Sequence, residues 1–453
     1  MRSANQPFDH ILDNNIARAK TVSRHISRNV TLNSIKRITQ TSFALEKAAF
    51  RWLRNRKQPL PILLRDTCEE LGATYIKLGQ LVASSPSIFP HEYVEAFQTC
   101  LDDTRPVPFK VIEKTLKQEL GKNYRDLFQF IDPEPLASAS IAQVHAAIWH
   151  NGDKVVIKVQ KPDVEQTLET DFQFMALSAK LLETILPNFP KGSITDMVEE
   201  IRNGMLDECD FYKEARNIHA YENFLRETNI THVVVPKVYL QGTKKRVLTM
   251  EHFFGAPLSD IESVRRYTPN AEETLINALN TWFKSLTHCQ IYHADLHAGN
   301  VMVLEDGRVG FIDFGIVGKI SKPTWDALLT LLVAIPMKDY FGIANSLIAI
   351  GATYKNVNTI SFAKDIQALV ESLMADNSTT THSVDGYTAN VNPDQYIQHF
   401  TLQLSNISKK HGIRFPREFT LLLKQFLYFD RYVRLLAPEL QMFDDERVLL
   451  GKM

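Results

Sequence analysis

The sequence has few cysteines, almost no net charge and no long apolar run, and each absence excludes a class of protein. The four cysteines are widely spaced and form no C-x-x-C pair, so we expect reduced thiols rather than a disulfide scaffold. A formal net charge of −1 over 453 residues gives no bulk attraction to nucleic acid. No H-E-x-x-H zinc motif, internal repeat or low-complexity tract occurs.

The sequence also shows no pattern of a signal peptide or of a membrane-spanning helix. The first thirty residues contain no continuous apolar stretch of the signal-peptide type. The longest apolar run, 327–337, is too short to cross a membrane and contains Pro336. These features predict a cytoplasmic protein with no signal peptide and no transmembrane helix. Any attachment to the inner face of a membrane would be peripheral.

Charge is nevertheless unevenly distributed along the chain. Residues 1–60 carry twelve Lys or Arg against three Asp or Glu, with apolar residues at partly helical spacing. This pattern predicts a basic amphipathic helical segment, which could lie on an anionic membrane surface. A solvated helix face packed on the rest of the protein explains the pattern equally well.

The most informative residues form two short motifs in the second half of the chain. Residues 293–300 read H-A-D-L-H-A-G-N, and D-F-G begins thirteen residues after Asn300. Together they match the kinase pattern H-x-D-x-x-x-x-N followed by D-F-G. In that pattern Asp295 is the catalytic carboxylate, while Asn300 and Asp313 hold Mg²⁺. A chance hairpin with solvated carboxylates explains either motif alone but not both at this spacing, so we predict binding of ATP or ADP with Mg²⁺.

The segment between the two motifs is predicted to be a β-hairpin. Residues 301–312 contain two alternating apolar runs around Asp306-Gly307. An Asp-Gly pair supplies the positive φ values that a type I′ turn requires. Such a hairpin would carry Asn300 at its entrance and Asp313 at its exit, where both side chains could reach one metal ion.

A second group of candidate residues lies upstream. Residues 152–160 read as a turn and a buried strand that contains Lys158, near a V-A-I-K-like motif. A lysine in such a strand needs an anion, unless it reaches solvent from a sheet edge. Glu214, in a helical stretch, is the predicted partner that would hold Lys158 against the α- and β-phosphates.

The segment 246–252 is predicted to be a strand that leads into the hinge between two lobes. In this interpretation Met250 flanks the adenine ring of the nucleotide. The backbones of Glu251 and His252 would hydrogen-bond the base.

Several parts of an ordinary protein kinase are missing. No G-x-G-x-x-G precedes the Lys158 strand; its place is taken by an alanine- and serine-rich loop of Ala137, Ser138, Ala139 and Ser140. Alanine narrows the φ/ψ range of such a phosphate-binding loop compared with glycine. The catalytic loop has Ala294 where protein kinases usually carry arginine and His297 where they usually carry lysine, and no A-P-E follows. These absences argue against phosphorylation of ordinary protein substrates.

Four motifs in order make the sequence similar to the UbiB/AarF family of atypical kinases, over roughly residues 60–438. They are K-x-G-Q at 77–80, the alanine-rich loop at 137–140, E-x-D at 208–210, and the H-x-D-x-H-x-G-N form of the catalytic loop at 293–300. Ser138 departs from the family pattern, in which an alanine is more usual.

The resemblance implies an α+β, atypical two-lobed protein-kinase-like fold with an N-terminal helical extension that crosses the active site. Lys77 and Gln80 of the extension would lie there, with Lys77 near Glu208 of the motif that ends at Asp210. The family is described as ATPase-like or self-phosphorylating and as supporting quinone biosynthesis at a membrane. Quinone-biosynthesis proteins or lipid precursors are therefore implied partners.

The resulting architecture has four parts: a basic segment 1–60, a helical extension 61–131, a small lobe 132–255 and a mostly helical large lobe 256–453. Predicted strands cover residues 140–149, 154–160, 232–238 and 246–251. Predicted helices cover residues 91–101, 163–186, 195–225, 322–334, 362–373, 395–410 and 417–436.

Two other functions fit parts of the sequence. Small-molecule phosphotransferases use similar H-x-D-x-x-x-x-N loops, but they lack K-x-G-Q and E-x-D. A nucleotide-binding scaffold without transfer activity has no chemical need for all five of Lys158, Glu214, Asp295, Asn300 and Asp313. An atypical kinase or ATPase is the function that the whole pattern favours.

Overall fold

The computed structural model describes residue 47 and residues 59–71, 74–76, 79, 91–97, 106–185, 193–258, 260–289, 291–353, 356–379, 403–404, 406–440 and 445–448. The chain divides into two compact units. Unit 1 comprises residues 1–85, 90–219 and 236–252, and unit 2 comprises residues 86–89, 220–235 and 253–453. Most of the basic segment 1–60 lies outside the described residues.

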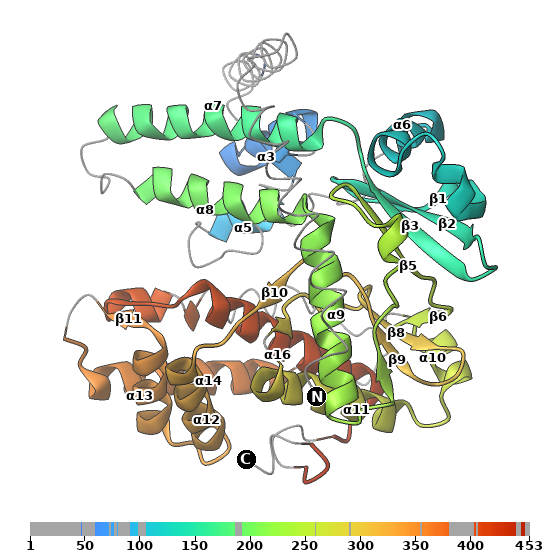
Figure 1. Ribbon diagram of the computed structural model, residues 1–453. Coiled ribbons are helices and arrows are strands. Elements are labelled where there is room, and N and C mark those ends of the chain that lie inside the picture. The colour runs from blue at the N-terminus through green and yellow to red at the C-terminus, as the bar shows by residue number, and fades with distance from the viewer. Residues whose placement is uncertain are drawn as a thin grey trace. The chain divides into compact units, whose positions relative to one another are not determined.

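Unit 1 is built on a four-stranded antiparallel sheet in the order β1-β2-β3-β5 (Figure 1). The strands are β1 (Phe128–Ser138), β2 (Ala142–Trp149), β3 (Lys154–Gln160) and β5 (Val247–Glu251). β3 is rich in β-branched residues and buried except at Lys154 and Lys158, as expected of an inner strand. Helix α6 (Phe109–Leu120) packs its fully buried Ile112 and Leu116 on this core.

The other helices of unit 1 either precede β1 in the chain or lie between β3 and β5. They are α3 (Leu60–Leu71), α5 (His91–Phe97), α7 (Val164–Ile185), α8 (Ser193–Glu208) and α9 (Phe211–Glu227), which continues into unit 2. α7 and α8 lie side by side (Figure 1) and share a core that includes Phe172, Ile201 and the buried Cys209.

The single helix predicted over 195–225 is wrong, because the chain breaks between α8 and α9. At the break the Asp210 carboxylate accepts a hydrogen bond from the Tyr212 N–H at 3.1 Å. A short acidic side chain at this position caps the first turn of a new helix by satisfying one of its unpaired N–H groups. The Gln160 amide donates to the Cys209 carbonyl and ties the break to β3.

Strand β1 was not predicted. It begins at Phe128, so the predicted boundary between residues 131 and 132 falls inside a strand. Its sequence contains Pro133 and Pro135 and has no simple alternation of buried and exposed residues. β1 lies at the edge of the sheet, where proline is tolerated because one side of the strand needs no ladder hydrogen bonds.

Unit 2 contains a second sheet in the order β4-β9-β8-β6. Its strands are β4 (Val233–Val234), β6 (Gly255–Pro257), β8 (Val301–Leu304) and β9 (Val309–Phe311), and shorter pairs join β7 (Tyr292–His293) to β10 (Val317–Gly318) and β11 (Ala352–Thr353) to β12 (Ile413–Arg414). The predicted hairpin is confirmed as β8–β9.

The turn of this hairpin differs from the predicted type I′. The Gly307 N–H donates to the Leu304 carbonyl at 2.9 Å, which makes Glu305 and Asp306 the central residues of the turn. Among residues 305–307 only Gly307 has a positive φ, +83°. This is the three-residue loop in which a turn with negative φ values is followed by a left-handed glycine.

The helices of unit 2 include a pair, α11 (Ala271–His288) and α16 (Arg417–Leu436), that shares an aromatic core. The other described helices are α10 (Ile261–Tyr267), α12 (Lys322–Ala334), α13 (Tyr340–Ile350) and α14 (Thr359–Thr379). The fully buried Trp282 of α11 contacts the rings of Phe426 and Phe429 on α16 at centroid distances of 5.6 and 5.1 Å. Helix α16 is thereby fixed against α11.

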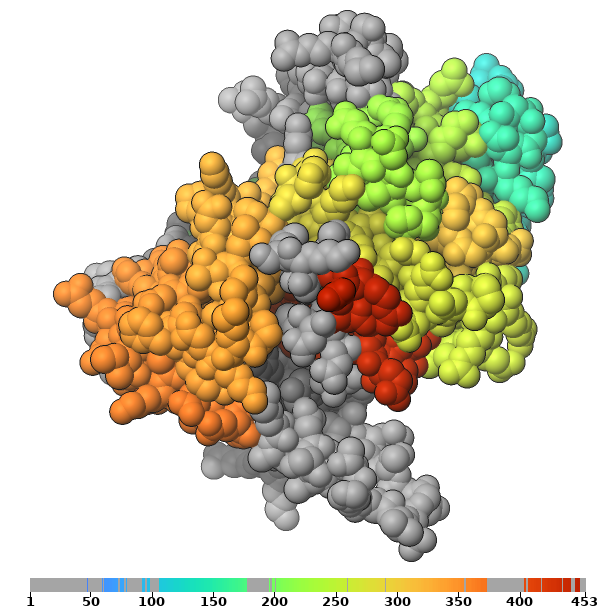
Figure 2. Space-filling view, turned by 90° about the horizontal axis from the view of Figure 1, so that it is seen from below, coloured from blue at the N-terminus to red at the C-terminus, as the bar shows by residue number. Residues whose placement is uncertain are grey.

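The predicted helices 322–334 and 417–436 are confirmed as α12 and α16, and 362–373 lies inside α14. Of the predicted helix 395–410, only residues 403–404 and 406–410 are described, and they are helical. Five large apolar side chains are exposed on α12, α13, α14 and the turn after α12: Val333, Ile335, Met337, Phe341 and Ile360. These helices are coloured orange in Figure 2. Over the described part of the chain, no helix is both long and apolar enough to cross a membrane.

Candidate active site

The candidate residues of unit 1 centre on Lys158 of β3. Its ammonium Nζ lies 3.0 Å from both carboxylate oxygens of Glu214 in the first turn of α9, so the predicted ion pair forms. The side chains are 15% and 4% exposed, respectively. Lys158 Nζ also lies 5.5 Å from the centre of the Phe211 ring, within cation–π range. The lysine is held by an anion and a ring rather than reaching bulk solvent.

The alanine- and serine-rich loop connects β1 to β2, next to the Lys158 strand. Ala137 and Ser138 end β1, and the Ala139 N–H donates to the Ala142 carbonyl at 2.9 Å to close the turn. Ser140 is buried. Within the described chain the buried Ser138 hydroxyl has no hydrogen-bond partner. An orphaned hydroxyl here fits a loop that receives hydrogen-bonding ligand atoms.

The predicted adenine-binding segment differs from expectation in one respect. Met250 is buried on β5. The Glu251 N–H donates to the Lys237 carbonyl at 2.9 Å, and the His252 N–H donates to the Lys154 carbonyl at 3.1 Å. Both backbone donors are thus used inside the protein, which argues against their donating to an adenine base.

The catalytic-loop motif of unit 2 is organised by His293 at the end of β7. The ring is fully buried. Its Nε2 atom is 3.0 Å from the Ile312 carbonyl oxygen, and its Nδ1 atom is 3.2 Å from the Asp295 backbone nitrogen. Because the Asp295 N–H must donate to Nδ1, the proton sits on Nε2 and is donated to Ile312. Burial lowers the pKa of His293, which favours this neutral form. The histidine therefore ties the loop to the end of the β8–β9 hairpin.

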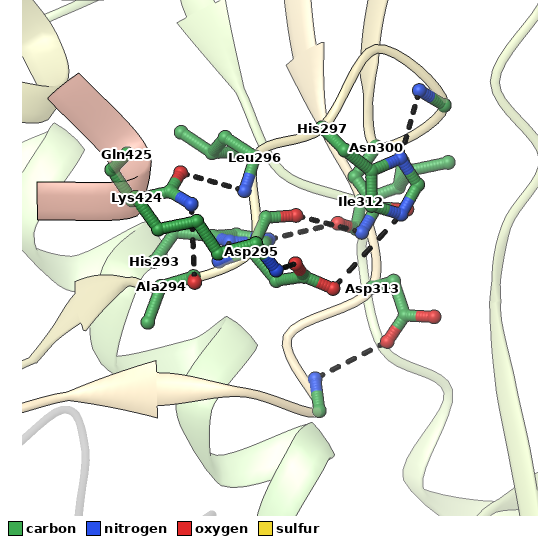
Figure 3. A network of polar contacts seen from close by, with 12 residues as sticks. His293, Ala294, Asp295, Leu296, His297, Asn300, Ile312, Asp313, Lys424 and Gln425 are labelled. Atoms are coloured by element: carbon green, nitrogen blue, oxygen red, sulfur yellow. Dashed lines mark hydrogen bonds and ion pairs between the residues drawn. The ribbon is translucent and has the colours of Figure 1, made fainter. Parts of the chain in front are cut away.

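The Asp295 carboxylate lies between two basic side chains (Figure 3). One oxygen is 3.0 Å from the Lys424 ammonium of α16, and the other is 3.9 Å from His297 Nε2. Burial would raise the pKa of Asp295, but the Lys424 and His297 charges outweigh burial and hold it below the usual range. The group is therefore ionised at neutral pH, as an acceptor of protons must be.

Asn300 and Asp313 lie at the two ends of the hairpin, as predicted. The Ile312 N–H donates to the Asn300 carbonyl at 3.0 Å, so the residue before Asp313 is directly bonded to Asn300. The Asn300 amide nitrogen donates to the Asp295 carbonyl at 2.9 Å, which leaves Oδ1 as the atom suited to a metal. Asp313 adopts a left-handed backbone with φ of 57°, a strained conformation of the kind that clusters at functional sites.

These donors suit Mg²⁺, which prefers oxygen ligands and is usually held by only one or two protein groups besides phosphates and water. An amide oxygen and a carboxylate are such a pair. In the described parts of the chain, no three His, Cys, Asp or Glu residues cluster so that they could hold a metal ion. The amide oxygen of Asn300 and the carboxylate of Asp313 fit a metal that is shared with phosphates.

The extension residues Lys77 and Gln80 lie outside the described residues. Of the E-x-D motif, Glu208 ends α8 and Asp210 caps α9, four residues before Glu214 in the first turn of that helix. Burial raises the pKa of Asp210. The aspartate of this motif thus positions the helix that presents Glu214 to Lys158.

Comparison with known proteins identifies the family. Residues 99–347, more than half of the chain, match the family model described as the ABC1 atypical kinase-like domain. The chain belongs to this family. It is 45% identical over 402 residues to an uncharacterised, chloroplastic aarF domain-containing protein kinase of Arabidopsis thaliana, covering 86% of this chain and 74% of the relative. It is 29% identical over 422 residues to the probable protein kinase UbiB of Haemophilus ducreyi, covering 91% and 75% of the two chains.

A solved structure of a Mycobacterium tuberculosis protein in complex with erythromycin matches with 23% identity and a TM-score of 0.49, covering 88% of this chain and 97% of that chain. The ABC1 family match confirms the predicted α+β, kinase-like fold class and the resemblance to UbiB and AarF. The crossing of the active site by the N-terminal extension stays a prediction.

Two residues of this ABC1-family site were missed by sequence reasoning. Lys424 and Gln425 lie 129 residues after the catalytic-loop atoms that they contact. Their local signal is a Lys-Gln pair inside an otherwise apolar stretch of α16, L-L-L-K-Q-F-L. Such a pair indicates a polar contact in a core but not its partner, because the partner depends on tertiary packing.

Proposed function

We propose that this ABC1-family protein binds Mg²⁺–ATP and hydrolyses it or transfers its γ-phosphoryl group to itself, in support of quinone biosynthesis at a membrane. The observation that carries the proposal is the buried Lys158–Glu214 ion pair, formed by residues 56 positions apart. Phosphoryl-transfer enzymes of the kinase class use this pair to hold a lysine against the α- and β-phosphates.

The other residues have corresponding roles in the proposal. Asn300 and Asp313 would hold Mg²⁺, which when bound neutralises charge on the phosphates. Asp295 orients a hydroxyl or water and accepts its proton as that oxygen bonds to the γ-phosphorus. The bond from the γ-phosphorus to the bridging oxygen breaks, and ADP leaves with the bonding electrons. The ionised state of Asp295 supports this role.

The direct test supplies γ-labelled ATP and Mg²⁺ to the purified full chain, with myelin basic protein as a generic acceptor. We expect slow release of phosphate or labelling of the chain itself, little label on the acceptor, and loss of both signals in Lys158→Met. Efficient labelling of myelin basic protein would instead indicate a conventional protein kinase. Complete absence of release and self-labelling would indicate a nucleotide-binding scaffold.

The quinone part of the proposal is supported by relatives named UbiB. It can be tested in a deletion strain by measuring quinone and its precursors. Complementation by the wild-type gene is expected to restore quinone, and complementation by Asp295→Asn is not. Normal quinone levels in the deletion strain would exclude this role.

Membrane attachment is proposed for the basic segment 1–60 alone. We expect the full chain to sediment with anionic vesicles but not with neutral vesicles, and to detach as salt rises, because such attraction is screened beyond about 8 Å at physiological ionic strength. A truncation that begins near residue 60 should lose this binding. If the truncated protein sediments equally well, the basic face is simply solvated.

A further inference from the structure

Helix α16 holds the backbone of the catalytic loop (Figure 3). Gln425 is fully buried; its Oε1 accepts from the Leu296 N–H at 2.8 Å, and its Nε2 donates to the Ala294 carbonyl at 3.1 Å. Two helical turns later, on the same side of α16, the Tyr432 hydroxyl donates to the Leu296 carbonyl at 3.0 Å. The residues on both sides of Asp295 are therefore fixed by this helix.

The same helix also fixes the Asp295 side chain. Lys424 Nζ donates to Asp295 Oδ1 at 3.0 Å, and the lysine side chain is only 32% exposed. One helical turn on, the ring of Tyr428 lies 5.4 Å from the same ammonium. A cation that contacts both a ring and a carboxylate has fewer rotamers available than a solvated lysine, so the carboxylate it bonds is also restrained.

The catalytic loop supplies no permanent cation of its own. His297 stands where protein kinases usually carry lysine, and its Nε2 lies 3.9 Å from Asp295 Oδ2, beyond hydrogen-bond distance. Its Nδ1 is already used by the Gly299 N–H at 3.0 Å. Lys424, supplied from α16, is thus the charged group bonded to the Asp295 carboxylate.

We propose that Lys424 is a positioning residue for phosphoryl transfer: it holds the Asp295 carboxylate in the one orientation that receives the proton, while Gln425 and Tyr432 hold the backbone on either side. The proposal rests on the proposed function, because it assigns Lys424 a part in that reaction. Catalysis depends steeply on such placement, since a misplacement of about 1 Å can cost on the order of 100-fold in rate.

The test compares ATP turnover by the full-length wild type and five variants. Lys424→Met keeps the length of the side chain and removes its charge; we expect kcat to fall about 10- to 100-fold while KM for ATP changes less than about twofold. Lys424→Arg keeps a cation on α16 and should lose less than Lys424→Met. The matched control is Lys410→Met, which removes another ion-paired lysine of unit 2, 2.8 Å from Asp365, and should leave kcat unchanged.

The last two variants, Asp295→Asn alone and combined with Lys424→Met, separate positioning from general structural support. If Lys424 acts through Asp295, adding Lys424→Met to Asp295→Asn should cause no further loss of kcat. The proposal would be overturned if the fall in kcat of the double variant equalled the product of the two single falls. It would also be overturned if Lys424→Arg and Lys424→Met lost kcat equally, or if Lys424→Met left kcat unchanged.

Absence of ATP turnover in the wild type would refute the proposed function but would not test the position of Asp295. A structural measurement decides the positioning role in that case. High-resolution crystal structures of the wild type and Lys424→Met report directly on the Asp295 side chain. We expect one ordered rotamer in the wild type and a displaced or multiply placed carboxylate in the variant. The same single rotamer in both would overturn the positioning role.

Discussion

Replacing Asp295 by asparagine is expected to lower kcat for ATP turnover by about 10²- to 10⁴-fold, the usual contribution of a general base. Asparagine has nearly the same shape but cannot accept a proton from the attacking oxygen. Because Asp295 orients the acceptor rather than the metal, we expect the affinity for Mg²⁺–ATP to stay close to that of the wild type.

The measurement pairs steady-state turnover with nucleotide affinity in the same preparation. Asp326→Asn, an exposed aspartate on α12 with no part in the site, is the matched control and should leave both values unchanged. A kcat for Asp295→Asn within twofold of the wild type would show that another group receives the proton. A large loss of affinity would show instead that Asp295 takes part in holding the metal.

The second large effect is expected at the other end of the hairpin. Asp313→Asn should weaken Mg²⁺–nucleotide binding on the order of 10- to 100-fold, because a charged oxygen ligand becomes a neutral one. The fold should survive, since asparagine is among the few side chains that tolerate the left-handed backbone of position 313 (φ 57°). Alanine would add strain of about 1–2 kcal/mol there, which would confuse loss of binding with loss of stability.

Thermal unfolding with and without Mg²⁺–ATP measures this effect. A ligand at 100 times its dissociation constant stabilises the folded state by about 2.7 kcal/mol, and a 10- to 100-fold weaker affinity lowers this to about 1.4 to 0.4 kcal/mol. Between about half and most of the ligand-induced rise in Tm should therefore vanish in Asp313→Asn. Asp306→Asn, at the tip of the same hairpin, is half exposed and should keep the full rise. An undiminished rise in Asp313→Asn would exclude Asp313 as a metal ligand.

Local sequence patterns predicted the parts of this fold whose stability is decided nearby in the chain. The β8–β9 hairpin follows from alternating apolar residues around an Asp-Gly pair, and α12 and α16 follow from their apolar spacing. The type of the hairpin turn was wrong because the glycine takes the third loop position rather than the second. The Asp306-Gly307 pair alone does not determine which residues are joined by the hydrogen bond that closes the turn.

The missed elements depend on their place in the tertiary structure. β1 contains two prolines and reads as a loop, yet it forms because an edge strand needs a ladder on one side only. The break between α8 and α9 lies within one apolar-periodic stretch, and it is stabilised by the capping bond of Asp210 and the bond from Gln160 to the Cys209 carbonyl. Helical spacing alone cannot distinguish one long helix from two.

The candidate site shows the same division. The Lys158–Glu214 pair was predictable because a lysine in a buried strand requires an anion, and the structure contains that bond. The engagement of the Glu251 and His252 N–H groups was not predictable, because their acceptors come from Lys237 and Lys154. The bond from Lys424 to Asp295 was not predictable either, because the sequence of α16 does not indicate which residue Lys424 contacts.

The central claim is that this ABC1-family chain binds a nucleotide together with a metal ion, through Lys158 and through Asn300 and Asp313 of the catalytic-loop and D-F-G motifs. Calorimetric titration of the full chain with ATP, with Mg²⁺ present and after its removal by EDTA, tests this most directly. We expect one nucleotide bound per chain in the presence of Mg²⁺, a large loss of affinity without it, and weaker binding in Lys158→Met. Absence of binding under all conditions, or binding that neither EDTA nor Lys158→Met alters, would contradict the claim.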